Sequence, residues 1–366
     1  MSTSPFDSYQ APEPPGGRRR RGEERMVPRV RPTRHDAGAG GDGADGSTSY
    51  YGQPVVKPMP WGHEIPAYLF LGGVAAVSGM LGAGAHASAR PVMRRNARLT
   101  SIAAVAASGA LLVADLGRPE RFLNMLRTIK LTSPMSVGTW IFSGFSAASG
   151  LAAAAEVDRM LGGRGGRGLP VLGRIVRPLE PAGSLGSLLL GPPLAAYTAV
   201  LLSDTATPVW IESRRTLPLV FVSSAAMASA GLQVAMSPPA ETGPAQRLAV
   251  LGAIGDHVAV AATERRLREL DIDDVLHDGP AGAKLRAAKV LTVTGGLAML
   301  VGRRWRSAGV AGGLALATAS ALTRFAIVEA GIASATDPRH TVALQRARLS
   351  ERQARGVVDD SITTAG

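Results

Sequence analysis

The chain has 366 residues, of which 46% are hydrophobic but only 4% aromatic, and 44 are glycine. Soluble cores bury more large rings than this, whereas membrane helices pack through small residues that let their backbones approach closely. The net charge of +12 would suit nucleic acid, but the arginines flank apolar blocks, where membrane proteins carry them. Cysteine is absent, which excludes disulfides, thiolate zinc sites and cysteine-ligated iron–sulfur clusters within this chain. We therefore expect an all-α integral membrane protein that does not bind nucleic acid.

The first 60 residues are rich in proline, glycine and arginine. Such a stretch cannot bury enough apolar surface to offset the entropy lost on ordering, so a disordered tail is expected over 1–60. The arginines at 18–21 are not followed by an apolar stretch before Trp61, which argues against a twin-arginine export signal. We expect the membrane domain over 61–335 and a polar C-terminal tail over 336–366.

Eight apolar blocks follow the first tail, and most reach the roughly 17 to 25 residues that a bilayer requires. They cover residues 65–87, 99–116, 136–157, 184–203, 217–236, 245–263, 287–301 and 306–333. The seventh block is short because Arg303 and Arg304 end it. The sequence thus predicts about eight transmembrane helices, a number compatible with two four-helix bundles.

Eight spans place both termini on one side of the membrane, together with the loops that follow the even-numbered spans. The loops on the two sides carry nearly equal numbers of arginines and lysines, but the tails add basic residues to the side of the termini. Loops rich in these residues tend to stay in the cytoplasm. An arginine-bearing tail without a signal peptide is also hard to export. We therefore predict that both termini of this cell-membrane protein are cytoplasmic.

Polar residues gather at one end of the first four predicted helices. Ionisable groups in or near membrane helices are costly, so each marks a candidate site. Because successive helices alternate in direction, the start of the first helix and the ends of the second and fourth lie at the same face. Each member also has a structural explanation, such as an ion pair that ends the second helix or a packed tyrosine ring. The residues are His63 and Glu64 at the start of the first helix, Asp115 and Arg118 at the end of the second, and Tyr197 in the fourth.

A second group lies in the later helices, with Asp256 in the sixth and Arg324 and Glu329 in the eighth. Asp256 is expected to face a partner rather than lipid, and Arg324 is the obvious candidate for that partner. A buried ion pair that links helices and a proton relay both remain open. Too few histidines are suitably placed to ligate haem, and no metal site is expected.

Several stretches resemble the NrfD/PsrC family, which comprises polysulfide reductase-type, quinone-reactive membrane subunits. The resemblance extends over about residues 50–340 and leaves the N-terminal tail outside. The stretch that begins at Asp115 is the most specific part. The matching stretches are 64–73 (EIPAYLFLGG), 115–119 (DLGRP), 133–140 (SPMSVGTW), 197–202 (YTAVLL) and 322–325 (LTRF).

The resemblance implies an eight-helix subunit without metal or haem that binds a quinone, either menaquinone or ubiquinone. The quinone site would lie near the face contacted by a ferredoxin-like iron–sulfur subunit, and a molybdopterin enzyme often completes such complexes. By its place in the YTAVLL motif, Tyr197 would correspond to the quinone-binding tyrosine. His63 and Glu64 would supply the polar residues of the first helix. Arginine-rich chains such as this one look like the formate-dehydrogenase-associated type.

Proton exchange with the quinone is expected to involve Asp115, Glu64 or His63. Arg118 would keep Asp115 ionised when the site is empty. Two other functions also fit the sequence. One is a secondary transporter that uses Asp256, Arg324 and Glu329 as a midplane site, with a helix broken at the proline pair 192–193. The other is a membrane anchor without quinone chemistry. Co-purification of an iron–sulfur partner would argue against the transporter.

Overall fold

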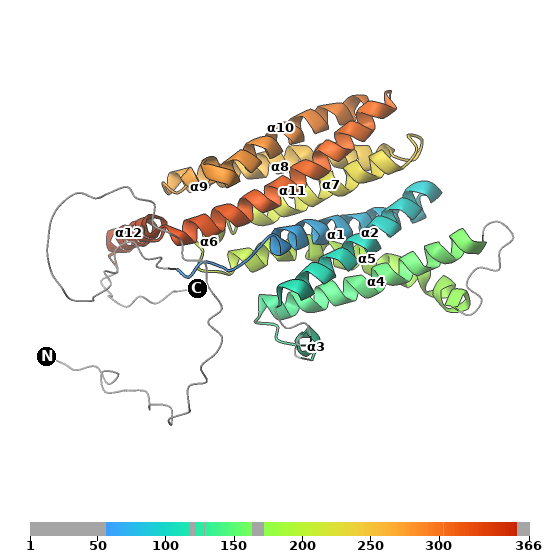
Figure 1. Ribbon diagram of the computed structural model, residues 1–366, viewed down its shortest axis with the longest axis horizontal. Coiled ribbons are helices and arrows are strands. Elements are labelled where there is room, and N and C mark those ends of the chain that lie inside the picture. Colours follow the sequence, from blue (N-terminus) through green and yellow to red (C-terminus); the bar gives the residue numbers. More distant parts are fainter. Residues whose placement is uncertain are drawn as a thin grey trace, which may run out of the picture. The chain divides into compact units, whose positions relative to one another are not determined.

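The computed structural model describes residues 56–116, 120, 122–127, 129–162, 172–302 and 304–356. Eight long helices run side by side in this part of the chain, and it contains no strand (Figure 1). Each of them overlaps one of the eight apolar blocks of the sequence. They are α1 (Glu64–Ala87), α2 (Pro91–Asp115), α4 (Pro134–Gly162), α5 (Leu172–Ser203), α7 (Leu217–Met236), α8 (Gly243–Glu269), α10 (Gly279–Val301) and α11 (Arg306–Thr336). The tail predicted for 1–60 lies, up to residue 55, outside the described residues.

The long helices form two four-helix bundles. In the first, α1 packs against α2 and α5, and α4 packs against α5 and α2. In the second, α7, α8, α10 and α11 pack against one another, with α10 beside α11 and α7 beside α8. Helix α1 also contacts α7 and α11, so it joins the two bundles and is the most buried of the apolar helices.

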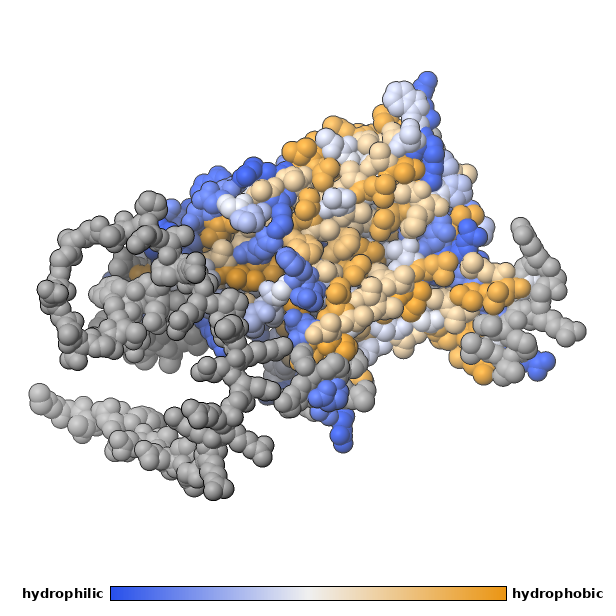
Figure 2. Space-filling model, viewed as in Figure 1, coloured by the Kyte–Doolittle hydropathy of each residue, from blue (hydrophilic) through white to orange (hydrophobic). Residues whose placement is uncertain are grey.

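Six of the described helices are long and apolar enough to cross a membrane: α1, α2, α4, α5, α7 and α11. These six confirm an all-α, multi-pass membrane protein. Helices α8 and α10 carry more charge, yet each turns a row of apolar side chains outward. Figure 2 shows an apolar band between hydrophilic ends on the visible face. The count of eight spans therefore stays a prediction, supported by the outward side chains Leu251, Ile254 and Val258 of α8 and Val290, Val293, Leu297 and Leu300 of α10.

Close approach between helices depends on small residues. A side chain added at Gly231 of α7 would meet the backbone of Gly313 in α11, and one added at Gly313 would meet the backbone of Gly231. Without a hydrophobic driving force in lipid, helices associate through such close packing. The high glycine content of the chain thus serves helix packing here.

Four shorter helices lie at one end of the bundles: α3 (Phe122–Met125), α6 (Pro208–Glu212), α9 (Asp274–His277) and α12 (Pro338–Ala354). Helix α12 falls within the stretch 336–366 that the sequence indicated as a polar tail. Asp337 caps it by accepting a hydrogen bond from a first-turn backbone N–H. His340 and Arg348 then tie α12 to Asp274 and Glu212. Side-chain pairs of this kind order a helix that is too polar to enter the membrane.

Candidate functional site

A pair of tyrosines joins α1 to α5 inside the first bundle. The hydroxyl oxygens of Tyr68 and Tyr197 lie 3.1 Å apart, within hydrogen-bond distance. Tyr68 is buried, whereas Tyr197 is partly exposed. They are the two tyrosines among the described residues. The sequence indicated Tyr197 as a site residue but did not identify its partner.

Helix α4 forms a wall beside the tyrosine pair. Gly138 faces the ring of Tyr197 so closely that an added Cβ would collide with the ring carbons. One helical turn later, the ring of Phe142 tilts against that of Tyr68, with the centroids 6.3 Å apart. Residues four apart share one helix face, so a single face of α4 contacts both tyrosines. Gly138, the first residue of the GTW part of the 133–140 stretch, therefore has a packing role.

Three ionisable residues lie nearer to the end of the bundle than the tyrosine pair, where α1 begins and α2 ends. His63, Glu64 and Asp115 are all exposed. Glu64 and Asp115 lie close enough for their charges to interact. Tyr68 follows Glu64 by four residues, which places the tyrosine pair about 6 Å deeper at 1.5 Å of rise per residue. The predicted convergence of helix ends is therefore observed for these residues, whereas Arg118 lies outside the described residues.

The chain that leads into α1 is anchored by tryptophan. The ring of Trp61 stacks on that of Trp210, with their centroids 5.4 Å apart. Trp210 is fully buried, and its indole N–H donates to the carbonyl oxygen of Ile327 at 2.9 Å. The His63 ring lies 6.1 Å from the ring of Phe325. These contacts with α6 and α11 fix the start of α1 and so position Glu64 and the turn that follows.

The second group of candidate residues lies apart from the first. Asp256 of α8 and Arg324 of α11 are both buried. Their charges are close enough to interact, but no ion pair joins them in the described part of the chain. Arg324 instead donates to the carbonyl oxygen of Phe221 at 2.7 Å and lies 3.7 Å above the Phe221 ring. Among the described residues, Asp256 Oδ1 and Arg324 Nε and Nη1 have no hydrogen-bond partner.

Glu329, the third member of that group, pairs with a different residue. Its carboxylate contacts Lys284 of α10, with Nζ and Oε2 2.6 Å apart. The three residues therefore do not form one cluster. Glu329 also lines a cavity of about 490 Å³ at the end of the second bundle. Of the residues singled out in the sequence, Glu329 alone lines that cavity.

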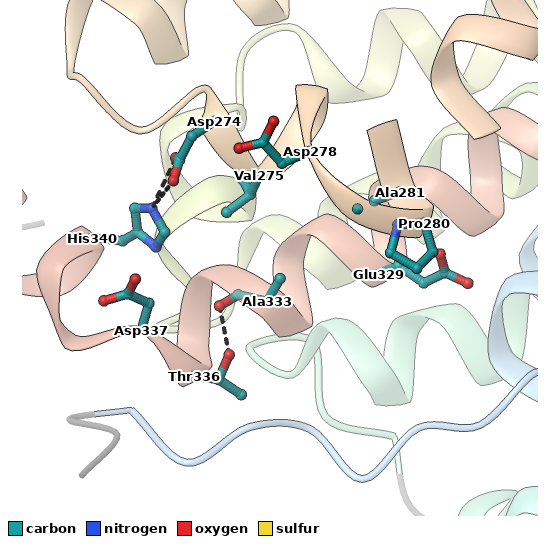
Figure 3. Close-up of a pocket in the computed structure, with 11 residues that line it drawn as sticks. Asp274, Val275, Asp278, Pro280, Ala281, Glu329, Ala333, Thr336, Asp337 and His340 are labelled. Atoms are coloured by element: carbon teal, nitrogen blue, oxygen red, sulfur yellow. Dashed lines mark hydrogen bonds and ion pairs between the residues drawn. The ribbon is translucent and has the colours of Figure 1, made fainter. Parts of the chain in front are cut away.

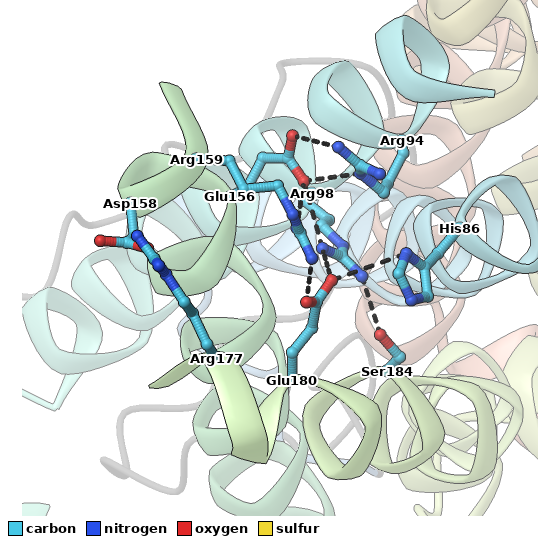
Figure 4. Close-up of polar contacts among 9 residues, drawn as sticks. All are labelled: His86, Arg94, Arg98, Glu156, Asp158, Arg159, Arg177, Glu180 and Ser184. Carbon is cyan, nitrogen blue, oxygen red and sulfur yellow. Dashed lines mark hydrogen bonds and ion pairs between the residues drawn. The ribbon is translucent and has the colours of Figure 1, made fainter. Parts of the chain in front are cut away.

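A buried charge network that was not predicted lies at the opposite end of the first bundle (Figure 4). Arg98 of α2 is almost fully buried and contacts Glu180 of α5 at 2.6 Å and Glu156 of α4 at 3.1 Å. Arg94 donates hydrogen bonds to both carboxylate oxygens of Glu156, at 2.8 and 3.0 Å. Arg159 contacts both glutamates as well. The network ties together three helices that are not all neighbours in sequence.

A signal for this network was present in the sequence. Arg94 and Arg98 are four residues apart, so they share one face of a helix. Glu156 and Glu180 lie at the ends of apolar blocks that alternating topology brings to the same side of the membrane as the two arginines. In the described part of the chain, no three histidine or acidic side chains converge to hold a metal ion.

Comparison with known proteins gives a family. A family model described as polysulphide reductase, NrfD, matches residues 54–240, slightly more than half of the chain. The match extends from the segment before α1 to the end of α7, so it contains Tyr68, Tyr197 and Asp115 and excludes Asp256 and Arg324. A comparison with curated proteins found no match. The chain therefore belongs to the NrfD, or polysulphide reductase, family of multi-pass membrane subunits of respiratory oxidoreductase complexes.

Proposed function

We propose that this subunit binds a quinone at the end of the first bundle and exchanges electrons with a partner subunit. The observation that carries the proposal is the Tyr68–Tyr197 pair, which lies below the exposed residues His63, Glu64 and Asp115. These residues fall within the segment that matches the family model. Burial of Tyr68 and partial exposure of Tyr197 suit a ligand that approaches from the Tyr197 side.

The residues of the site fit a quinone head group chemically. Its carbonyl oxygens need hydrogen-bond donors, and the hydrogen-bonded pair of tyrosine hydroxyls leaves one proton to donate. Gly138 lets the Tyr197 ring lie against α4, and the ring of Phe142 in the same helix tilts against Tyr68. Apolar and aromatic walls with a few fixed polar groups are typical of cofactor sites.

When bound, a quinone accepts two electrons and two protons. Tyr197 would hold a quinone oxygen through its hydroxyl, and Tyr68 would fix the orientation of that hydroxyl. Glu64, His63 and Asp115, exposed at the membrane surface, take up protons from water or release them to it. The sequence has Arg118 three residues after Asp115, and a cation there would stabilise the charged form of the carboxylate.

The electrons come from outside the chain. With no cysteine, the chain cannot hold a cysteine-ligated cluster, so a ferredoxin-like iron–sulfur subunit would deliver or receive electrons. A molybdopterin enzyme would complete the complex. The partner would contact the end of the bundle where α1 begins, because electron transfer requires a short distance to the quinone.

A second candidate function rests on the buried Asp256 and Arg324. Unpartnered polar atoms in a membrane interior are costly, so they often mark a substrate or proton pathway. A transporter would use them as its substrate site. Helix α5 runs without interruption through the proline pair 192–193, so it does not supply the broken helix that this reading expected.

Two substitutions in the purified complex test the quinone site. Asp115→Asn keeps the size of the side chain but removes its titratable proton, so quinone turnover should fall by about 10²-fold or more, a typical scale for general acid–base catalysis. Asp256→Asn is the control and should leave quinone binding unchanged. If Asp115→Asn assembles and turns over normally while Asp256→Asn abolishes quinone binding, the site lies in the second bundle and the proposal is wrong.

A further inference from the structure

A cavity of about 490 Å³ lies at the end of the second bundle, far along the chain from the tyrosine pair (Figure 3). This volume is within the range of roughly 300 to 1,000 Å³ that is usual for small-molecule sites. The walls come from α9, the start of α10, the end of α11 and the first turn of α12. The polar side chains of the lining are Asp274, Asp278, Glu329, Thr336, Asp337 and His340.

His340 presents an acceptor to this cavity. Its Nε2 lies 2.9 and 3.1 Å from the two oxygens of Asp274. A carboxylate accepts hydrogen bonds, so Nε2 carries the proton, and Nδ1 of the neutral ring is then an acceptor. The side chain is 95% buried, and Nδ1 has no hydrogen-bond partner among the described residues. A buried acceptor without a donor is costly, which indicates that a donor from outside the chain completes it.

The carboxylates of the lining are only partly neutralised. Glu329 pairs with Lys284, and Asp337 with Arg339. The hydrogen bond from the Arg339 guanidinium lowers the pKa of Asp337, so this carboxylate is charged at neutral pH. Asp278 is exposed, and its side chain makes neither a capping hydrogen bond nor an ion pair among the described residues. The cavity therefore keeps a negative charge on a chain whose net charge is +12.

The negative charge and the hydrogen-bond acceptors of the cavity lining together indicate the chemical class of the ligand. The described side chains do not converge closely enough to hold a metal ion. We propose that the cavity binds an ammonium or guanidinium group, which donates hydrogen bonds to Asp278, Asp274 and His340. Charge-assisted hydrogen bonds of this kind are about twice as strong as neutral ones. The group comes either from a free polyamine or from a lysine or arginine side chain of a partner subunit.

The test uses the full chain, first in detergent and then in its native complex. Spermidine is the probe, and choline is the comparison probe because it is a cation without an N–H donor, with one positive charge instead of three. The variant is Asp278→Asn, which breaks no hydrogen bond or ion pair that holds the fold. The control variant is Glu351→Gln on α12, which removes one charge from an exposed carboxylate outside the cavity.

The expected result is that spermidine binds the wild-type chain and Glu351→Gln equally, and Asp278→Asn about tenfold more weakly. Choline should bind none of them detectably. If spermidine does not bind, but Asp278→Asn releases a subunit from the complex at lower salt than Glu351→Gln does, the group belongs to a partner. Equal behaviour of the two variants in both assays overturns the proposal. Binding of choline as tight as that of spermidine also overturns it.

Discussion

Tyr68 and Tyr197 share one hydrogen bond across the interface between α1 and α5. Each hydroxyl has one proton, so one of them donates to the other and a single proton remains for a third group. Because Tyr197 is the more exposed residue, the arrangement in which Tyr68 donates leaves the Tyr197 proton for a ligand. A hydroxyl that accepts a hydrogen bond also becomes a better donor, since hydrogen bonds in a chain polarise one another.

The first prediction concerns this pair. Tyr197→Phe should weaken quinone binding by roughly 0.5 to 1.5 kcal/mol, or about 2- to 12-fold, because it removes one hydrogen bond. Tyr68→Phe should have a smaller effect of the same sign, since it removes only the orientation of the Tyr197 hydroxyl. In the double variant the losses should be less than additive, as expected for groups in direct contact. Quinone dissociation constants of the four proteins provide the measurement, and additive losses would contradict the proposed coupling.

The second prediction concerns the wall of the site. Gly138→Ala places a methyl group where the Tyr197 ring lies, so the ring must shift. Overpacking of this kind costs about 1 to 3 kcal/mol, and the displaced hydroxyl should lose contact with both Tyr68 and the quinone. Quinone affinity should therefore fall at least as much as in Tyr197→Phe.

The matched control for the wall is Gly150→Ala in the same helix. A methyl group at 150 would lie 3.9 Å from the nearest side-chain atom, Ile102 Cδ1, which is an ordinary contact. Alanine is the better helix former by about 1 kcal/mol, so Gly150→Ala should be neutral or stabilising. Equal quinone affinity in the two alanine variants would show that the ring of Tyr197 does not depend on Gly138.

The number and order of the long helices followed from the apolar blocks, but their ends did not. The second block was placed at 99–116, whereas α2 begins at Pro91. The fourth was placed at 184–203, whereas α5 begins at Leu172. In both cases charged residues precede the apolar centre and indicated a loop. They continue the helix because several of these charges pair with residues on neighbouring helices, and hydropathy along one segment contains no information about such partners. The paired residues are Arg94 and Arg98 of α2 and Arg177 and Glu180 of α5.

The candidate site was likewise predicted only in part from the sequence. Alternating helix direction was enough to predict that Glu64 and Asp115 lie at the same end of the first bundle, because this depends on topology alone. The partner of Tyr197 was missed because it depends on how α1 and α5 rotate about their axes. Tyr68 was nevertheless within the 64–73 stretch and one helical turn after Glu64. The cavity beside α12 could not have been found, because the sequence indicated a polar tail there.

The third prediction concerns the buried charge network. Arg98→Gln leaves Glu156 and Glu180 buried with less compensating charge. Breaking a buried network from one side typically costs about 3 to 5 kcal/mol, so the purified variant should melt at a clearly lower temperature or fail to accumulate. Arg265→Gln is the control, because the Arg265 side chain is 82% exposed and, among the described residues, pairs only with the exposed Glu269. An exposed pair contributes about 0 to 1 kcal/mol, so equal melting temperatures would contradict the structural role of the network.

The last prediction is that both termini face the cytoplasm. The numbers of basic residues in the loops left the orientation nearly undecided. The structure shows that one arginine counted on the side opposite the termini does not act as a loop residue. Arg98 is buried inside the first bundle, so it is not available to lipid head groups or to hold a loop in the cytoplasm. The basic residues of α12 and of the tail after α11 stay on the side of the termini. An alkaline phosphatase fusion at Gly366 should be inactive, and one within 162–168 should be active, because that enzyme works only after export. An active C-terminal fusion together with an inactive loop fusion would reverse the orientation. It would then place the quinone site, with its iron–sulfur partner, on the outer side of the membrane.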